Sequence, residues 1–166
     1  MALKLLIMNS QPGRTHSAPV ILKAGLLAGT LDILSAFTYY YIKTGKNPMN
    51  VLTYVSNTAL GKETFSSTAV QQLTGLLVHF AIAFGWTVLF FLLYPRLKFL
   101  QANRIITAVL YGSFVWSMMN LVILPVWNHK MFQYKGETTI VNWLILIVAI
   151  GMPLSFIASS HWQKRG

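Results

Sequence analysis

The residues of this chain that could do chemistry are few, and they stand inside apolar segments. Asp32 interrupts an apolar run from Val20 to Ile42, and His79 and Asn120 interrupt two later runs. A carboxylate at bilayer depth costs a few kcal/mol or more unless it is partnered, so such a residue indicates a functional site. A carboxylate near an imidazole could relay a proton or a cation. We group six residues as one candidate polar cluster: Asp32, His79, Asn120, Ser113, Ser117 and Gln72.

Depth decides whether these groups can meet. At a rise of about 1.5 Å per residue, Asp32 lies about 15 Å below the outer end of its segment, and His79 and Asn120 lie about 9 Å below theirs. Asp32 and His79 could then touch directly or through a water molecule. We expect one coupled unit, either an ion pair or a neutral pair with the proton on Asp32, whose titration belongs to both groups. The alternative is a structural hydrogen-bonding role that keeps the helices in register.

Other chemistries find less support in the residues. A haem or metal site would need a second ligand for His79, and the other histidines (His16, His129 and His161) stand at membrane edges. The absence of cysteine excludes a thiolate site. We therefore expect no cofactor and no metal. Trp86 and Trp116 are interpreted as packing residues.

An enzyme is the weakest functional class. The chain has three acidic residues, and only Asp32 is in an apolar segment, which excludes a paired-carboxylate site or a carboxylate-rich magnesium site in the membrane. Gly-rich phosphate loops, HExxH and GxSxG are absent from the sequence. A Ser–His–Asp set of Ser113 or Ser117 with His79 and Asp32 is arithmetically feasible, but serines are common in membrane helices. We expect no enzymatic activity.

Four apolar segments must position these residues. Apolar residues make up 55% of the 166 and charged residues 10%, against about a quarter in a soluble domain. The segments cover about residues 20–42, 73–94, 105–126 and 140–158, each long enough to cross a bilayer as a helix. Their short connections leave no room for a soluble domain. The sequence predicts an all-α, polytopic membrane four-helix bundle that forms one domain over residues 1–166.

Small residues recur on one side of each segment. Small side chains at steps of three or four let helices approach closely, and Pro153 is expected to kink the fourth span. Between the first two spans, residues 48–60 follow Asn47 and precede Gly61 with amphipathic spacing, so we predict an interfacial helix that serves as a lid or as a structural strap. An aromatic interfacial hairpin is expected over Trp127–Thr139. The glycines expected at helix contacts are Gly25, Gly29, Gly75, Gly112 and Gly151.

The net charge of +10 is explained by membrane topology, and no nucleic-acid partner is needed to account for it. Eight cations stand in the N-terminal region, the 94–104 turn and the C-terminus, and five stand in the other two loops. Because Lys and Arg favour cytoplasmic loops, we expect both termini in the cytoplasm, with the lipid bilayer as partner. The first 19 residues hold only LLIM as an apolar core, so we expect an uncleaved tail.

Three stretches carry a resemblance. GLLAGTLDI around Asp32, GLLVHFAIAFGWTVLFF around His79 and YGSFVWSMMNLVILP around Asn120 resemble small four-span bacterial inner-membrane proteins of the YagU-like type. The resemblance covers the first three spans but neither the tail nor the fourth. That family has no agreed activity, so the resemblance implies a fold, a bacterial inner-membrane location, and that the three polar residues belong together.

The functional expectation is a small transport-like or proton-responsive module whose polar cluster handles a proton, a cation or a small polar solute. No convincing internal repeat relates the halves of the chain, and four spans are few for a monomeric carrier, so transport predicts a homo-oligomer. The alternative is a non-catalytic subunit or assembly factor of a membrane complex.

Overall fold

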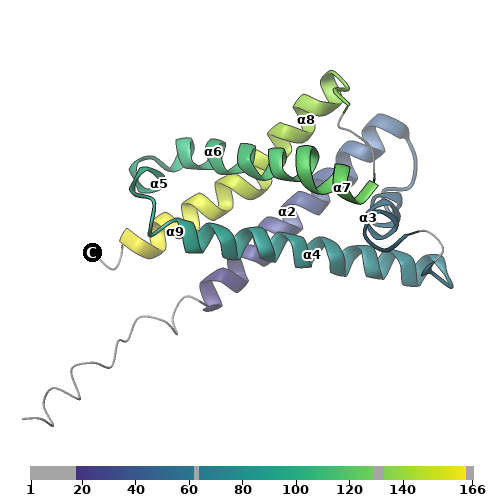
Figure 1. Cartoon of the computed structure of the whole chain (residues 1–166), viewed down its shortest axis with the longest axis horizontal. Helices are drawn as coiled ribbons and strands as arrows, with labels where there is room; N and C mark the ends of the chain where they lie inside the picture. Colours follow the sequence, from purple (N-terminus) through teal and green to yellow (C-terminus); the bar gives the residue numbers. More distant parts are fainter. Residues whose placement is uncertain (1–17, 62–63, 129–132, 164–166) are drawn as a thin grey trace, which may run out of the picture.

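Four long apolar helices dominate the structure. The computed structural model describes residues 18–61, 64–128 and 133–163, and within these ranges the chain is helical and contains no strand (Figure 1). The helices long and apolar enough to cross a membrane are Ala18–Thr44, Thr68–Leu93, Arg104–Trp127 and Glu137–Trp162. The predicted all-α four-helix bundle is confirmed, and the length and composition of its helices fit a multi-pass membrane protein.

Shorter elements divide or connect these helices. The first and second spans are α2 (Ala18–Thr44) and α4 (Thr68–Leu93), with α3 (Asn50–Leu60) between them and α5 (Lys98–Ala102) after them. The third span consists of α6 (Arg104–Ser117), η2 (Met118–Ile123) and α7 (Leu124–Asn128). The fourth consists of α8 (Glu137–Leu146), η3 (Ile147–Gly151) and α9 (Met152–Gln163). We call the two ends of the bundle the α3 end and the α5 end; α2 begins and α9 finishes at the α5 end (Figure 1).

Polar side chains cap the helices where the sequence changes from loop to apolar run. The Asn103 side chain accepts hydrogen bonds from the backbone N–H groups of Ile105 and Ile106 at the start of α6, and Ser67 Oγ accepts one from Val70 at the start of α4. The interfacial helix begins at Asn50, two residues later than expected, because a turn at 48–49 precedes it. It ends before Gly61, whose φ of 85° stops the helix.

A π-helical segment precedes a proline in each of the last two spans. The η3 segment ends two residues before Pro153, and η2 ends two residues before Pro125. Proline has no N–H and its ring crowds the carbonyl four residues earlier, so the helical hydrogen-bond ladder must adjust in the preceding turn. Both widened turns face the middle of the bundle, where they contribute Asn120 and Ile150 to the cavity described below.

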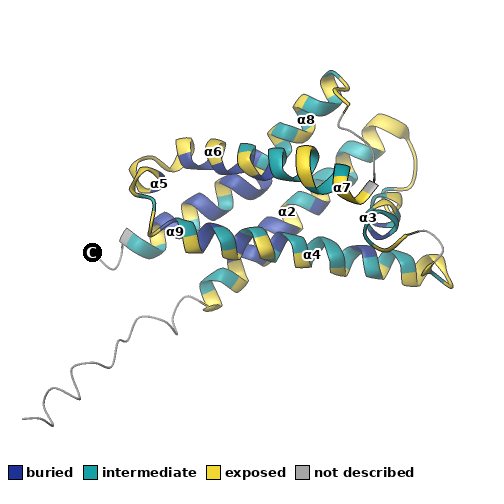
Figure 2. Ribbon diagram, viewed as in Figure 1, coloured by how far each residue is buried: buried dark blue, intermediate teal, exposed yellow. Residues whose placement is uncertain are grey.

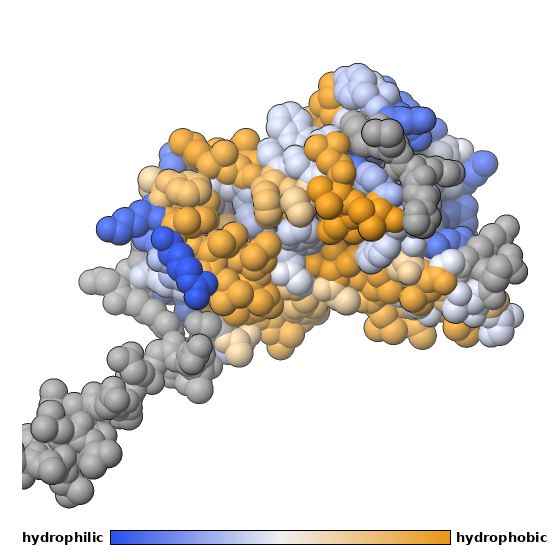
Figure 3. Space-filling model, viewed as in Figure 1, coloured by the Kyte–Doolittle hydropathy of each residue, from blue (hydrophilic) through white to orange (hydrophobic). Residues whose placement is uncertain are grey.

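The tightest packing lies toward the α5 end, where dark blue buried residues gather on α2, α4, α6 and α9 (Figure 2). Ala24 and Ala28 of α2 meet Phe90 of α4 and Leu154 of α9 in one apolar core. Hydrophobic residues also cover much of the outer surface, as orange atoms show (Figure 3). An apolar exterior around a packed interior is the arrangement that lipid requires.

Several expectations fall on residues outside the described ranges. These are the N-terminal tail up to residue 17, the part of the aromatic hairpin at 129–132, and the basic C-terminal residues Lys164 and Arg165. At the α3 end, the described part of the hairpin leads into α8, whose Glu137 forms an exposed ion pair of 3.0 Å with Lys43 of α2.

Candidate functional site

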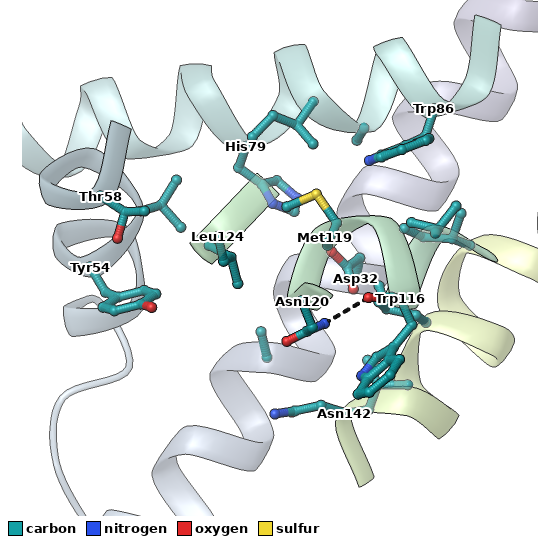
Figure 4. A pocket seen from close by; sticks show the side chains of 18 of the residues that line it. Asp32, Tyr54, Thr58, His79, Trp86, Trp116, Met119, Asn120, Leu124 and Asn142 are labelled. Carbon is teal, nitrogen blue, oxygen red and sulfur yellow. Dashed lines mark hydrogen bonds between the residues drawn. The ribbon is translucent and has the colours of Figure 1, made fainter. Parts of the chain in front are cut away.

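A cavity of about 240 Å³ lies between the spans, in the half of the bundle that carries α3 (Figure 4). Every span contributes to its wall, and α3 contributes from the end. We call it the central pocket. It is lined by Asp32 and Ala36 of α2; Tyr54, Val55 and Thr58 of α3; His79, Ile82, Ala83 and Trp86 of α4; Val115, Trp116, Met119, Asn120, Leu124 and Trp127 of the third span; and Asn142, Ile145, Leu146 and Ile150 of the fourth.

Aromatic contacts close the pocket toward the α5 end. Tyr111 donates a hydrogen bond of 2.5 Å to the backbone carbonyl of Trp86, and its ring packs on Phe90 with centroids 4.6 Å apart. Trp86 also meets Phe114 edge to face. These contacts join α4 to α6. The pocket begins on the α3 side of these contacts, where Trp86 is one of its lining residues.

Asp32 faces the pocket without a hydrogen-bond or ion-pair partner among the described residues. It interacts electrostatically with His79, but the direct hydrogen bond that depth allowed does not form. Instead, His79 Nε2 lies 2.9 Å from the carbonyl oxygen of Gly29, which can only accept. Nε2 therefore carries the proton, and this bond holds α4 against α2 one turn before Asp32. Both residues lie on the pocket wall (Figure 4).

Asn120 reaches the same pocket from η2. Its Nδ2 donates a hydrogen bond of 3.0 Å to the carbonyl of Trp116 in the preceding turn. The bond orients the side-chain amide, and its oxygen makes no hydrogen bond to a described residue. Asp32, His79 and Asn120 are thus brought to one cavity, from three different spans.

The structure does not place Ser113, Ser117 and Gln72 in this pocket. Ser113 Oγ accepts a hydrogen bond of 2.9 Å from Trp143 Nε1 and ties α6 to α8. Both serines were expected to join Asn120 in one polar cluster, because the three residues recur at steps of four and three, as on one face of a uniform α-helix. The π-helical turn at η2 has more residues per turn, so Asn120 is rotated away from the serines and lines the pocket.

Aromatic residues are the part of the site that sequence reasoning missed. Trp86 and Trp116, interpreted as packing residues, line the pocket, as do Trp127 and Tyr54. A signal for Trp86 existed, because it stands seven positions after His79 and therefore on the same helix face. Trp116 likewise precedes Asn120 by four positions. No sequence spacing could bring in Tyr54, because it lies on a helix outside the spans.

The five glycines singled out from the sequence all lie where another helix comes close. An added methyl group would lie 2.5 Å from the Phe84 ring at Gly25 and 2.9 Å from the Phe80 ring at Gly29. At Gly112 it would lie 2.5 Å from Cα of Ile147. At Gly75 and Gly151 it would overlap the backbone carbonyls of Leu52 and Ala108. These contacts set the distances between the helices that surround the pocket.

Within the described residues, no group of three or more His, Cys, Asp or Glu side chains could hold a metal ion. Comparison with known proteins adds no relative: no protein-family model matches this chain, and no curated protein or solved structure matches it.

Proposed function

We propose that this protein is a transport-like membrane module in which the central pocket binds a small solute and Asp32 carries the charge or the proton that accompanies it. One observation carries the proposal: a carboxylate inside a spanning helix faces a cavity and forms no hydrogen bond or ion pair with a described residue. A carboxylate at this depth is costly. If Asp32 served only to hold helices together, it would be hydrogen-bonded to one of them.

The position of the pocket supports this proposal. Asp32 lies 12 residues before the end of α2 at Thr44, which is about 18 Å along the helix and near its middle. Solute and ion sites of membrane carriers lie near the bilayer midplane. Toward the α3 end the pocket wall becomes exposed, with Tyr54 at 55% and Trp127 at 43%, whereas Ala83 and Val115 are buried. We infer that a solute enters from the α3 end.

For the location we propose a bacterial inner membrane with both termini in the cytoplasm, since eight of the 13 basic residues stand in the N-terminal region, the 94–104 turn and the C-terminus of the sequence. The pocket would then open to the outside. The chain has no cysteine, so single cysteines can report on sidedness. Ser66→Cys in intact cells should react with a membrane-impermeant maleimide, and Lys98→Cys should react only after lysis. The reverse labelling pattern would show that both termini lie outside the cytoplasm.

The test of the proposed function is whether the pocket senses protonation through Asp32. Trp86 and Trp116 line the same cavity, so their fluorescence should report the charge on Asp32. In nanodiscs, the wild-type emission should change with pH, and Asp32→Asn should lose that change. Glu137→Gln, which removes an exposed carboxylate at the helix end, is the matched control and should keep it. An identical titration in Asp32→Asn would overturn the proposal.

The subunit role raised by the sequence makes a different prediction for the assembly. Native mass spectrometry after extraction in mild detergent should find a homo-oligomer if the protein is a transport module. A stoichiometric complex with another membrane protein, together with a fluorescence titration that does not depend on Asp32, would favour the subunit role.

A further inference from the structure

We propose that the solute of the central pocket is a small organic cation with an alkylated ammonium group, held by the charge of Asp32 and by the faces of indole and phenol rings. This inference rests on the proposed function and names its ligand class. It is carried by the chemistry of the pocket wall, which combines one carboxylate, several aromatic rings and apolar side chains.

The charge of the wall favours a cation. Its titratable groups are Asp32, His79 and Tyr54, and none of the described lining residues is a lysine or an arginine. An anion would find no lysine or arginine there, whereas a cation would neutralise Asp32, a carboxylate that forms no ion pair with a described residue.

The rings favour an organic cation. Three of the five tryptophans of the chain line the pocket, and they come from α4, α6 and α7, while Tyr54 comes from α3. A cation is attracted to the face of a tryptophan, most strongly when water is excluded, and aromatic cages recognise quaternary ammonium groups in this way. The labelled rings of Tyr54, Trp86 and Trp116 lie on different sides of the cavity (Figure 4), and Trp127 adds a fourth ring to its lining.

An inorganic cation fits less well. Hard metal ions take about six to eight oxygen ligands, or keep their own water shell. The wall offers few oxygens, from Asp32, Asn120, Asn142, Thr58 and Tyr54, and the residues between them are apolar, such as Ile82, Met119 and Ile145. A weakly hydrated alkylammonium group can contact such residues without losing strong hydration. The volume of about 240 Å³ restricts the ligand to a small molecule.

The test measures binding of benzyltrimethylammonium and choline to the full-length protein, in nanodiscs made from lipids without choline head groups. Quenching of tryptophan fluorescence gives the dissociation constant. The neutral analogue of choline, 3,3-dimethylbutan-1-ol, has the same shape without the charge, and potassium chloride supplies a small inorganic cation. Both quaternary ammonium ions should bind, and choline should bind at least about tenfold more tightly than its neutral analogue, the factor expected from one carboxylate and one ring.

Four variants locate the site. Asp32→Asn and Trp127→Leu should each weaken binding by about tenfold, and Trp86→Phe by less, because a phenylalanine ring retains part of the attraction. Trp127 is exposed at 43%, so its replacement tests the ring without removing a buried core residue. Trp143→Phe is the matched control, since Trp143 bonds Ser113 and does not line the pocket. It should leave the dissociation constant unchanged.

The outcomes separate the ligand class from the proposed function. Equal binding of choline and its neutral analogue, equal quenching by potassium, or binding that survives Asp32→Asn would overturn the ligand class. If neither quaternary ammonium ion binds while the Asp32-dependent fluorescence titration persists, the ligand class is wrong and the proposed function stands. If the titration is lost as well, both are wrong.

Discussion

The two halves of the bundle differ in how their interiors are filled. Toward the α5 end, Phe90, Leu154 and Ala158 are fully buried and pack into one continuous apolar core. Toward the α3 end, the same four spans surround the central pocket. The aromatic contacts of Tyr111 with Phe90 and with the Trp86 carbonyl form the boundary. One half can therefore hold the helices together while the other remains open to a ligand.

Side-chain size explains the difference. On α2, the residues that face the core are Ala24, Gly25 and Ala28, and α4 and α9 pack directly on them. Further along the same face come Asp32 and Ala36, which line the pocket together with rings from other helices. A comparison of the same kind of substitution in the two halves tests this division.

The largest contrast is expected from removing a large side chain. Phe90→Ala should lower the free energy of unfolding by about 3–5 kcal/mol, because it opens a void in a fully buried core. Ile145→Ala should cost only about 1 kcal/mol, since Ile145 already faces a cavity and loses partial burial. Reversible unfolding in mixed micelles measures both. Equal losses would show that the two halves are packed alike.

The next contrast concerns helix approach. Gly112→Ala should destabilise the protein by about 1–3 kcal/mol, because the new methyl group meets the backbone of Ile147 and forces α6 away from η3. Gly85→Ala is the matched control, since nothing lies within 4 Å of a methyl group there and alanine favours the helix. Thermal denaturation should give a lower Tm for the first variant and an unchanged or higher Tm for the second. An unchanged Tm for Gly112→Ala would mean that α6 and η3 are not closely packed at this position.

The smallest effect is expected inside the pocket. His79→Ala removes the hydrogen bond to the Gly29 carbonyl and should cost about 1 kcal/mol. Asp32→Asn should cost less, because no described residue bonds the carboxylate. A double-mutant cycle measured by unfolding should deviate from additivity by about 0.5 kcal/mol or more, since the two groups interact electrostatically. Strict additivity of the two changes in unfolding free energy would show that Asp32 and His79 are not coupled.

The sequence by itself determined the class of the molecule. Apolar runs of bilayer length predict four helices, because a helix forms its backbone hydrogen bonds within its own segment. All four helices appear in the structure. The interfacial helix was predictable to within two residues, because its apolar spacing and Gly61 are local signals. The glycine contacts were predictable, because a glycine without a side chain lets another helix come close to its backbone.

The tertiary structure alone decided how the site is composed. Depth along the helices brings Asp32, His79 and Asn120 to one cavity. The hydrogen-bond partner of each side chain depends on how its helix is rotated about the helix axis, and local sequence does not determine that rotation. The π-helical turn of η2 separated Asn120 from Ser113 and Ser117, and His79 found the Gly29 carbonyl instead of Asp32. Only the packing of all four spans could show that Asp32 forms no hydrogen bond with a described residue and that tryptophans from three elements line the same pocket. A cavity is the space that neighbouring helices fail to fill, so its lining is a property of the assembled bundle and not of any one segment.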